Sequence, residues 1–390
     1  MLVRDIGCDQ AAGRRRSVAM VEWEDNPFPP QEVWLELSDG SGDETESADH
    51  FLPICFPLAL LHGERRLRIE APLCPMLING LHLVAAWWLR WGGLPAETPE
   101  IEAMGSPRFR HGISWKQALS FVSGGIDSLH LLLDNRRRYR GDDPGYVTDA
   151  VFVHGFDIGK RRRAWEQRRS DEAFEAIRPL ADQVGVRLLR GSTNLRHLPT
   201  APDFWNLRYS GAATAGFGHF AACGTRFVMM GGPTDIATLN PLGLHPAVDV
   251  NYSSQRVTVA HEGARFSRLQ KLRDLLDWPL ALDGLRVCPA DYANGLNCGE
   301  CDKCLHTRLE LLAVGCDYSA AFGELRMPTD LLEAGVEIVH PYQANNYRNA
   351  LPGLRERGLD RLSRVIERKL QEYEGKPRTA RSWVEPAAPA

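Results

Sequence analysis

The sequence lacks a long hydrophobic run and a marked excess of charge of either sign. Its most apolar stretch, residues 77–91, is interrupted by Asn79 and His82 and ends near Arg90, so it is shorter than the roughly 20 residues that a membrane span needs. We expect a buried helix there. Lys and Arg number 46 against 50 Asp and Glu, and this balance gives no general attraction to nucleic acid or to a membrane.

A secretory signal is not evident either, because Arg4, Asp5 and Asp9 lie in the first ten residues and no apolar region follows them. The chain has nine cysteines. Five of them are scattered, which fits a reducing compartment, so we expect a cytoplasmic protein. The scattered cysteines are Cys8, Cys55, Cys74, Cys223 and Cys316.

Two common nucleotide-binding motifs are missing as well. No G-x-x-x-x-G-K-[ST] loop is present, and Gly216-Phe217-Gly218 lacks the third glycine of G-x-G-x-x-G. Residues 123–128 instead read Ser-Gly-Gly-Ile-Asp-Ser, between the apolar runs 118–122 and 129–133. Adjacent glycines between a strand and a helix let backbone amides approach an anion, and the helix N-terminus adds partial positive charge. The string predicts a phosphate-binding loop, with an ordinary Ser-capped turn as the alternative.

Four cysteines lie close together in the last third of the chain, with the spacing C-x9-C-x2-C-x2-C. Four thiolates suit a closed tetrahedral Zn²⁺ site. Such a site has no open coordination position for a substrate, so a role in folding is favoured over one in catalysis. We therefore expect structural zinc, with a redox-active pair or an iron–sulfur cluster as the alternatives. The expected ligands are Cys288, Cys298, Cys301 and Cys304.

The Ser-Gly-Gly-Ile-Asp-Ser string resembles the PP-loop of the ATP pyrophosphatase family, whose members cleave ATP between the α and β phosphates. Together with the cysteine cluster it is similar to the 7-cyano-7-deazaguanine synthase family, over about residues 115–315. Residues 230–235 stand where that family carries Gly-x-Asn-x-x-Asp, and Arg268 and Lys271 stand where it carries a lysine. The family's Tyr-Pro-Asp-Cys-Arg substrate segment is absent, and residues 242–249 lie near that place.

The resemblance implies an ATP site with Mg²⁺. Asp127 would orient the loop or help to bind Mg²⁺, and Arg268 and Lys271 would act with it in catalysis. Asp235 is a candidate for Mg²⁺ or substrate, with a helix N-cap as its alternative; the alternative for His154 is a strand-end histidine with a satisfied hydrogen bond. The ATP-binding residues so implied are Ser123, Gly124, Gly125, Ile126, Asp127, Ser128, Val153, His154, Gly231, Gly232 and Asp235.

Strand and helix patterns divide the chain into three regions. Residues 1–105 predict an N-terminal α+β accessory domain, with strands at 17–23, 32–37 and 66–69 and a linker at 92–105. Residues 106–285 alternate strands (118–122, 147–153, 186–189, 227–230) with helices (164–184, 210–223), which predicts a doubly wound, mainly parallel α/β sheet like that of adenine nucleotide alpha hydrolases. Residues 286–390 would form a zinc-binding, helical C-terminal region.

These observations predict an ATP-dependent C–N ligase. By resemblance it would adenylate a 7-carboxy-7-deazaguanine-like acid and form an amide or nitrile with a nitrogen nucleophile, and the terminal extensions suggest conjugation of the deazapurine to a protein partner. The alternatives are a PP-loop enzyme for RNA thiolation or amidation and a nucleotide-binding regulatory protein without catalysis. The basic runs 136–140 and 160–163 favour solvated helix faces over RNA contacts, because acidic residues interleave with them. We expect a homodimer, with neither membrane nor nucleic acid as partner.

Overall fold

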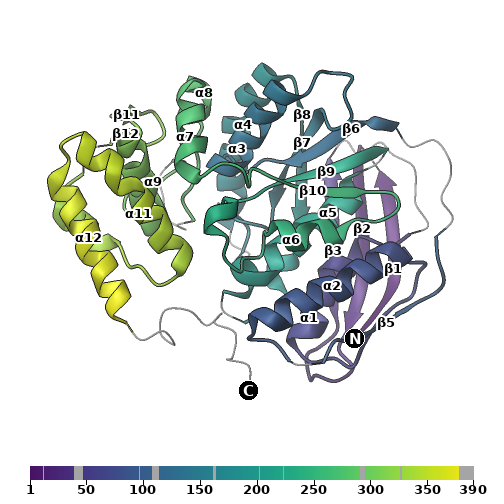
Figure 1. The fold of residues 1–390 in the computed structure, drawn as a ribbon. Helices are drawn as coiled ribbons and strands as arrows, with labels where there is room; N and C mark the ends of the chain where they lie inside the picture. The colour runs from purple at the N-terminus through teal and green to yellow at the C-terminus, as the bar shows by residue number, and fades with distance from the viewer. Residues whose placement is uncertain are drawn as a thin grey trace.

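The computed structural model describes residues 1–11, 13–38, 47–95, 97–107, 114–160, 164–201, 203–222, 224–289, 295–325 and 327–376. A ten-stranded sheet forms its centre (Figure 1), with the strand order β10-β9-β6-β7-β8-β3-β2-β1-β4-β5. The strands are β1 Leu2–Ala11, β2 Arg14–Glu22, β3 Gln31–Ser38, β4 Arg66–Ile69, β5 Glu100–Ala103, β6 Ser114–Phe121, β7 Val147–His154, β8 Arg187–Thr193, β9 Thr225–Gly231 and β10 Thr258–Glu262, and a separate hairpin pairs β11 Tyr318–Ser319 with β12 Gly323–Glu324.

The half of the sheet from β10 to β8 is entirely parallel. The chain runs from β6 outward through β7 to β8, and then returns to the other side of β6 to add β9 and β10. The strand order therefore reverses beside β6, and in open parallel sheets such a reversal leaves a crevice at the carboxyl ends of the strands. The prediction of an α/β fold with a mainly parallel sheet is confirmed.

The N-terminal strands continue this same sheet. Strand β3 pairs antiparallel with β8 through Leu35, Glu36 and Leu37, and β2 and β1 follow. Thr193 Oγ1 donates a hydrogen bond of 2.7 Å to the Trp34 carbonyl, which strengthens the junction. Strand β5 forms within the stretch predicted to be a linker. The N-terminal segment thus extends the central sheet, a feature that the local sequence pattern does not indicate.

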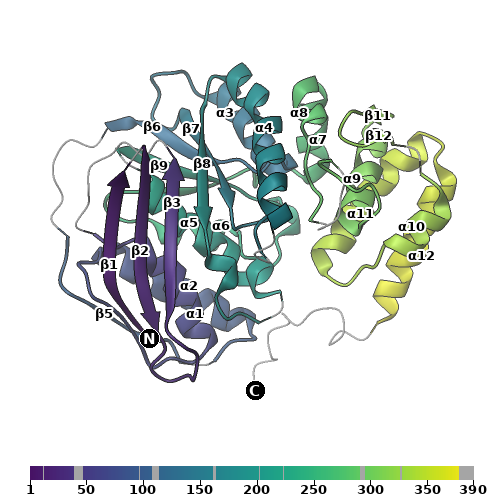
Figure 2. The ribbon, with the colours of Figure 1, turned by 180° about the vertical axis from the view of Figure 1, so that it is seen from behind.

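Helices cover both faces of the sheet (Figure 2). Helices α1, α2 and α5 pack on one face with Val151 and Val153, whereas α3, α4 and α7 pack on the other with Ala150 and Phe152, because successive side chains of a strand point to opposite faces. The helices are α1 Phe51–Leu61, α2 Pro75–Trp91, α3 Ile126–Arg138, α4 Ala164–Val184, α5 Ser210–Ala221, α6 Pro246–Asp249, α7 Arg268–Leu276, α8 Pro279–Asp283, α9 Asp302–Ala313, α10 Thr329–Gly335, α11 Pro341–Glu356 and α12 Asp360–Gly375.

Helix α2 corresponds to the predicted buried helix, but only one of its faces is buried. Leu81 and Trp88 are fully covered, whereas Leu83 is 51% and Trp87 41% exposed. The apolar run is continuous in sequence, yet a helix that lies on one face of a sheet buries only the stripe that faces the sheet. Among the described residues, no helix combines the length and the apolar character that crossing a membrane requires.

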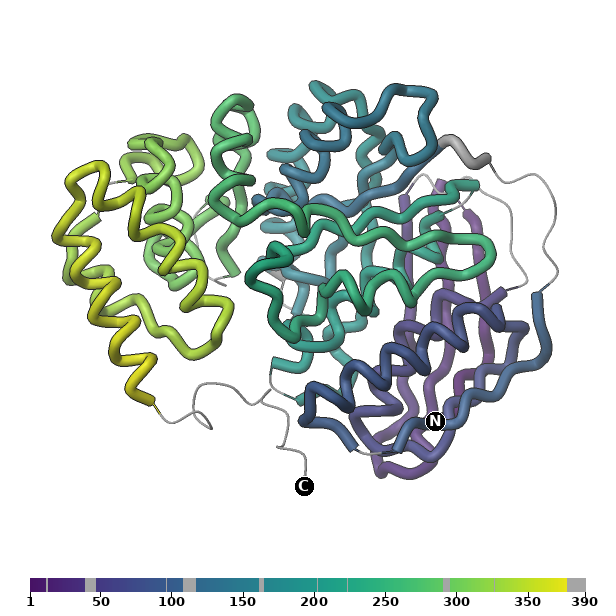
Figure 3. The backbone as a smooth tube through the Cα atoms, in the orientation of Figure 1, coloured from purple at the N-terminus to yellow at the C-terminus, as the bar shows by residue number. Residues whose placement is uncertain are grey.

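The C-terminal helices α9 to α12 form a group beside α7 and α8, away from the N-terminal strands (Figure 3). Helix α12 buries Leu362, Val365, Ile366, Leu370 and Tyr373, a spacing that places them on one face. This group shares the hydrophobic core of α3 and α4. The C-terminal region therefore packs against α7, a helix on the same face of the sheet as α3.

Candidate functional site

The Gly-rich loop connects β6 to α3 at the carboxyl edge of the sheet, beside the reversal of strand order. Ser128 Oγ donates to the Gly125 carbonyl at 2.9 Å, and the Gly125 amide donates to Ser123 Oγ at 3.2 Å. Gly124 has a φ of 78°, a left-handed conformation that favours glycine. The two serines thus close the loop, and the first amides of α3, which have no acceptor within the helix, are available to an anion.

Asp127, in the first turn of α3, is held by two cations from α7. Lys271 Nζ lies 2.8 Å from Asp127 Oδ1 and also donates to the Gly232 carbonyl at 2.5 Å. Arg268 Nη1 lies 3.7 Å from Asp127 Oδ2. The Lys271 side chain is 1% exposed, so its charge is paired in a buried position. The predicted catalytic residues Asp127, Arg268 and Lys271 therefore form one cluster.

A further arginine, Arg286, contacts the Gly-rich loop through two hydrogen bonds. Its amide donates to the Gly124 carbonyl at 2.8 Å, and its Nε donates to the Ser123 carbonyl at 3.0 Å. Burial of the guanidinium lowers the pKa of Arg286, which the nearby Asp157 carboxylate counteracts. Arg286 was not among the site residues predicted from the sequence. The feature of the sequence that could have indicated a role for Arg286 is its position two residues before Cys288, the first cysteine of the cluster.

A cavity of about 540 Å³ opens beside the loop, within the range of small-molecule sites. Polar groups of the loop and of α7, α9 and α11 form part of its lining, and aromatic and aliphatic side chains form the rest. Predicted nucleotide residues that line it are Ser123, Gly125, Ile126, Asp127, Ser128, Val153 and Gly231, and Arg268 joins them.

Three predicted ATP-site residues have other contacts. Asp235 Oδ1 accepts hydrogen bonds of 2.8 Å from the amide and hydroxyl of Thr238, so it caps the turn Ile236–Thr238. Gly232 packs against His261, whose Nε2 would lie 2.0 Å from a Cβ at that position. His154 Nδ1 is buried and has no hydrogen-bond partner in the described part of the chain, and burial lowers its pKa. These three residues lie outside the lining of the cavity, as do Gly124 and Lys271.

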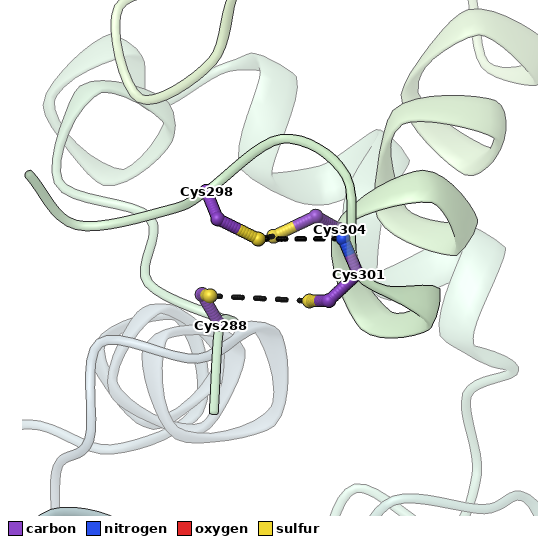
Figure 4. A group of neighbouring side chains, drawn as sticks. All are labelled: Cys288, Cys298, Cys301 and Cys304. Atoms are coloured by element: carbon purple, nitrogen blue, oxygen red, sulfur yellow. Dashed lines mark hydrogen bonds between the residues drawn. The ribbon is translucent and has the colours of Figure 1, made fainter. Parts of the chain in front are cut away.

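The four clustered cysteines converge from one loop and the start of α9 (Figure 4). All four sulfur atoms lie within 4.8 Å of one another. The Cys288 and Cys301 sulfurs are 3.9 Å apart, as are those of Cys298 and Cys304, and the Cys301 amide points at the Cys298 sulfur at 3.3 Å. The cluster can hold a metal ion, and an amide directed at a ligand sulfur stabilises its thiolate.

The cysteine cluster is connected to the Gly-rich loop through a short segment. Asn297 Oδ1 accepts from the amides of Val287 and Cys288 at 2.9 and 3.2 Å, and its Nδ2 donates to the Leu285 carbonyl at 2.7 Å. Arg286 lies within this segment and bonds to the loop, so the same short segment contacts both the loop and the cysteine cluster. Cys288 and Pro289 also line the cavity directly.

Helix α9 begins at the cysteine cluster and places polar side chains on the cavity. Asp302, Lys303 and His306 line it, and Asp302 is held by Tyr347 Oη at 3.0 Å. One turn further, Glu310 Oε2 accepts from Arg268 Nε at 2.8 Å. Burial opposes the charge of Glu310, but Arg268 and His306 hold its pKa below the ordinary value. Arg268 thus joins the loop carboxylate to the C-terminal helices.

We expect Glu310→Gln to destabilise the chain by about 3 kcal/mol, because it leaves the Arg268 guanidinium without its buried partner. Urea unfolding at pH 7 measures the change. Glu175→Gln is the matched control: Glu175 pairs with Arg178 at an exposed position, so its loss should change the stability far less. Equal effects in the two variants would contradict a structural role for the Arg268–Glu310 pair.

The pH dependence of the same variant follows from the lowered pKa of Glu310. A carboxylate whose folded pKa is depressed stabilises the fold above its ordinary pKa, 4.5 for glutamate, and this contribution is lost as the pH falls through the folded value. The stability difference between wild type and Glu310→Gln should therefore be full at pH 7 and shrink in acid. A difference that stayed constant down to pH 2 would contradict this origin.

The first basic run is engaged in contacts within the chain. Arg136 donates to the carbonyls of Val184 and Val147 and stacks over Tyr146, while Arg138 pairs with Glu262 at 2.6 Å. These contacts leave few of the positive charges available to a nucleic acid. Residues 161–163 of the second run lie outside the described residues.

Comparisons with protein-family models, with curated proteins and with solved structures find no match to this chain. The loop, the ion-pair cluster, the cavity and the cysteines are therefore the features that indicate a function.

Proposed function

We propose that this chain binds ATP at the Gly-rich loop, cleaves it between the α and β phosphates and adenylates a carboxylic acid. One observation carries the proposal: the loop, the Asp127–Lys271 pair and a cavity of about 540 Å³ meet at the reversal of strand order. A carboxylate oxygen of the acid attacks the α-phosphorus, and the bond to the oxygen that bridges to the β-phosphorus breaks. Loop amides and cations stabilise the charge that develops on the leaving pyrophosphate.

A nitrogen nucleophile then attacks the acyl carbon of the adenylate. The bond from that carbon to the AMP oxygen breaks, AMP leaves, and the nitrogen loses a proton, so that an amide forms. Ammonia and an amine of a protein partner enter this step in the same way, and a nitrile requires a second activation of the amide oxygen. By resemblance the acid is 7-carboxy-7-deazaguanine or a related heterocycle.

Mg²⁺ fits the loop side of this site. Carboxylate and phosphate oxygens are its usual ligands. Asp127 Oδ2 lies 3.7 Å from Arg268 Nη1, so it is less closely paired than Oδ1, which lies 2.8 Å from Lys271 Nζ. When bound, the ion would neutralise phosphate charge. Asp127 would then position the ion while Lys271 retains its bond to the Gly232 carbonyl.

Zinc fits the cysteine cluster. A tetrahedral site with Zn–S bonds of about 2.3 Å has sulfurs about 3.8 Å apart, close to the observed 3.9 Å pairs. With four thiolates the coordination is complete, so the ion supports the fold and the cavity lining without taking part in the reaction.

The products of turnover test the proposal. Incubation with ATP, Mg²⁺ and 7-carboxy-7-deazaguanine should yield AMP and pyrophosphate, and mass spectrometry identifies the nitrogen-containing product. Formation of ADP and phosphate would contradict α–β cleavage. Binding of ATP without turnover, with every acid and amine supplied, would favour a regulatory nucleotide-binding protein.

We expect Lys271→Met to lower kcat by about 10²- to 10³-fold, because a charge that stabilises the transition state is removed. The Kd for ATP should change much less, and both constants are measured on the purified variant. Arg273→Met is the control, since Arg273 is exposed on the same helix. Parallel losses of ATP affinity and rate would assign Lys271 to ground-state binding.

A further inference from the structure

Part of the cavity lining, which we call the aromatic wall, consists of Phe156, Trp205, Leu242, Leu244 and Arg196. The rings of Phe156 and Trp205 lie 5.3 Å apart. Leu242 and Leu244 belong to residues 242–249, which lie near the place of the Tyr-Pro-Asp-Cys-Arg segment of the resembled family. The side chains of the wall are thus apolar apart from the Arg196 guanidinium, and the Asp157 carboxylate, which also lines the cavity, acts on that guanidinium electrostatically.

Arg196 is unusual among the three arginines that line the cavity. Its guanidinium lies 4.3 Å from the centre of the Trp205 ring, and its Nη1 is buried without a hydrogen-bond partner. Within the described residues it has neither an ion pair nor a hydrogen bond, whereas Arg268 pairs with Glu310 and Arg286 with Asp157. A buried unpaired donor is costly, so a ligand that accepts from it would gain that energy.

The local backbone explains how the wall forms. Trp205 begins a π-helix, Trp205–Tyr209, which runs into α5; such turns are frequent at functional sites. The Gly243 amide donates to the Asn206 carbonyl at 2.8 Å, and the Gly211 amide donates to the Gly243 carbonyl at 3.1 Å. A Cβ on Gly211 would lie 2.1 Å from that carbonyl oxygen. Glycine at this position lets the Leu242–Leu244 segment pack directly on the π-helix and α5.

We infer that the aromatic wall binds the acid substrate as a flat ring that carries a carboxylate, and that Arg196 selects the carboxylate. This inference rests on the proposed function. Adenine is also flat, but it is uncharged and would leave the guanidinium unpaired. A carboxylate oxygen accepts strong hydrogen bonds from guanidinium, and its second oxygen stays free to attack the α-phosphorus. The apolar side chains contact the faces and edges of the ring.

Binding measurements by calorimetry test the inference with two probes, 7-carboxy-7-deazaguanine and 7-deazaguanine, which share a ring and differ in the carboxylate. Arg196→Met should weaken binding of the carboxylated ring by about 10- to 100-fold and leave the uncharged ring and ATP nearly unchanged. Trp205→Leu should weaken both rings. Arg178→Met and Trp87→Leu are the controls, because Arg178 pairs only locally with Glu175 and Trp87 is exposed on α2.

Several outcomes would overturn the inference. The wild-type chain could fail to bind the carboxylated ring, or Arg196→Met could weaken both rings equally. If Arg196→Met weakened ATP binding and left binding of the carboxylated ring unchanged, the aromatic wall would be assigned to adenine. The readout is affinity and does not depend on turnover. A wild-type chain that shows the expected pattern but forms no AMP would therefore contradict the proposed adenylation and leave this inference standing.

Discussion

A Gly124→Val chain is expected to lose ATP affinity by at least about a hundredfold, roughly 2.7 kcal/mol of binding. Gly124 has a φ of 78°, and a Cβ there would lie 3.3 Å from the Arg286 Cβ and 3.5 Å from the Gly284 carbonyl oxygen. A branched side chain in this conformation strains the backbone and separates the loop from its support. Calorimetric titration with ATP and Mg²⁺ measures the loss.

Gly185→Val is the matched control for that variant. Gly185 also has a left-handed conformation, with a φ of 66°, but a Cβ there meets nothing within 4 Å. Both variants should lose similar stability from backbone strain, of order 1–3 kcal/mol, and only Gly124→Val should lose ATP. Full ATP affinity in Gly124→Val would place the nucleotide away from residues 123–128.

Asp127→Asn tests the charge of the loop without changing its shape. The amide oxygen can still accept from Lys271, so the fold should survive, while turnover should fall by about 10²-fold or more because the arrangement of metal and pyrophosphate is disturbed. Steady-state AMP formation measures the effect. Activity equal to wild type would remove Asp127 from the reaction.

Replacement of one cluster cysteine is expected to have the largest effect on stability. The purified chain should carry one Zn²⁺, and Cys301→Ser should lose it and be destabilised by about 4 kcal/mol or more, because metal binding to a site that is absent in the unfolded chain contributes directly to folding. Metal analysis and urea unfolding measure the two effects. ATP affinity should also fall, since the segment that holds Arg286 against Gly124 ends at Cys288.

Cys8→Ser is the control for this change, because Cys8 is an exposed cysteine on β1, and it should keep both metal and stability. A chelator should reproduce the Cys301→Ser result in the wild type and leave the variant unaffected. Iron with sulfide in the purified protein, or a well-folded chain without metal, would contradict the zinc proposal.

Local sequence patterns predicted the parallel half of the sheet well. Helix α4 has the predicted bounds, 164–184, and β7 and β9 differ from the predicted strands by one to three residues. These elements have clear apolar periodicity and polar boundaries, which depend on neighbouring residues only. Strand β10, five residues long and partly exposed, has a weaker pattern and was not predicted.

The sequence predicted the loop and the cysteines of the candidate site, and the resemblance added Arg268 and Lys271, but neither indicated their supports Arg286 and Glu310 or the side-chain contacts. Asp127 and Lys271 are 144 residues apart in sequence, and Arg268 and Glu310 are 42 apart. No periodicity connects such pairs, because they meet only after α3, α7 and α9 have packed. The same holds for Arg196 and Trp205, whose stacking depends on the turn into α5.

The sequence by itself determined the features whose chemistry is local. Ser-Gly-Gly-Ile-Asp-Ser between apolar runs is sufficient for a tight turn between β6 and α3, and the spacing C-x9-C-x2-C-x2-C indicates the four thiols that the structure brings together. The tertiary structure alone decided that the N-terminal strands extend the same sheet through β3 and β8 and that Arg286, next to the cysteine cluster, bonds to the Gly-rich loop. It also decided that Arg196, which has no hydrogen bond or ion pair among the residues that the structure describes, stands beside the apolar side chains of the aromatic wall. Strand partners and side-chain contacts between distant segments depend on packing, which local sequence does not specify.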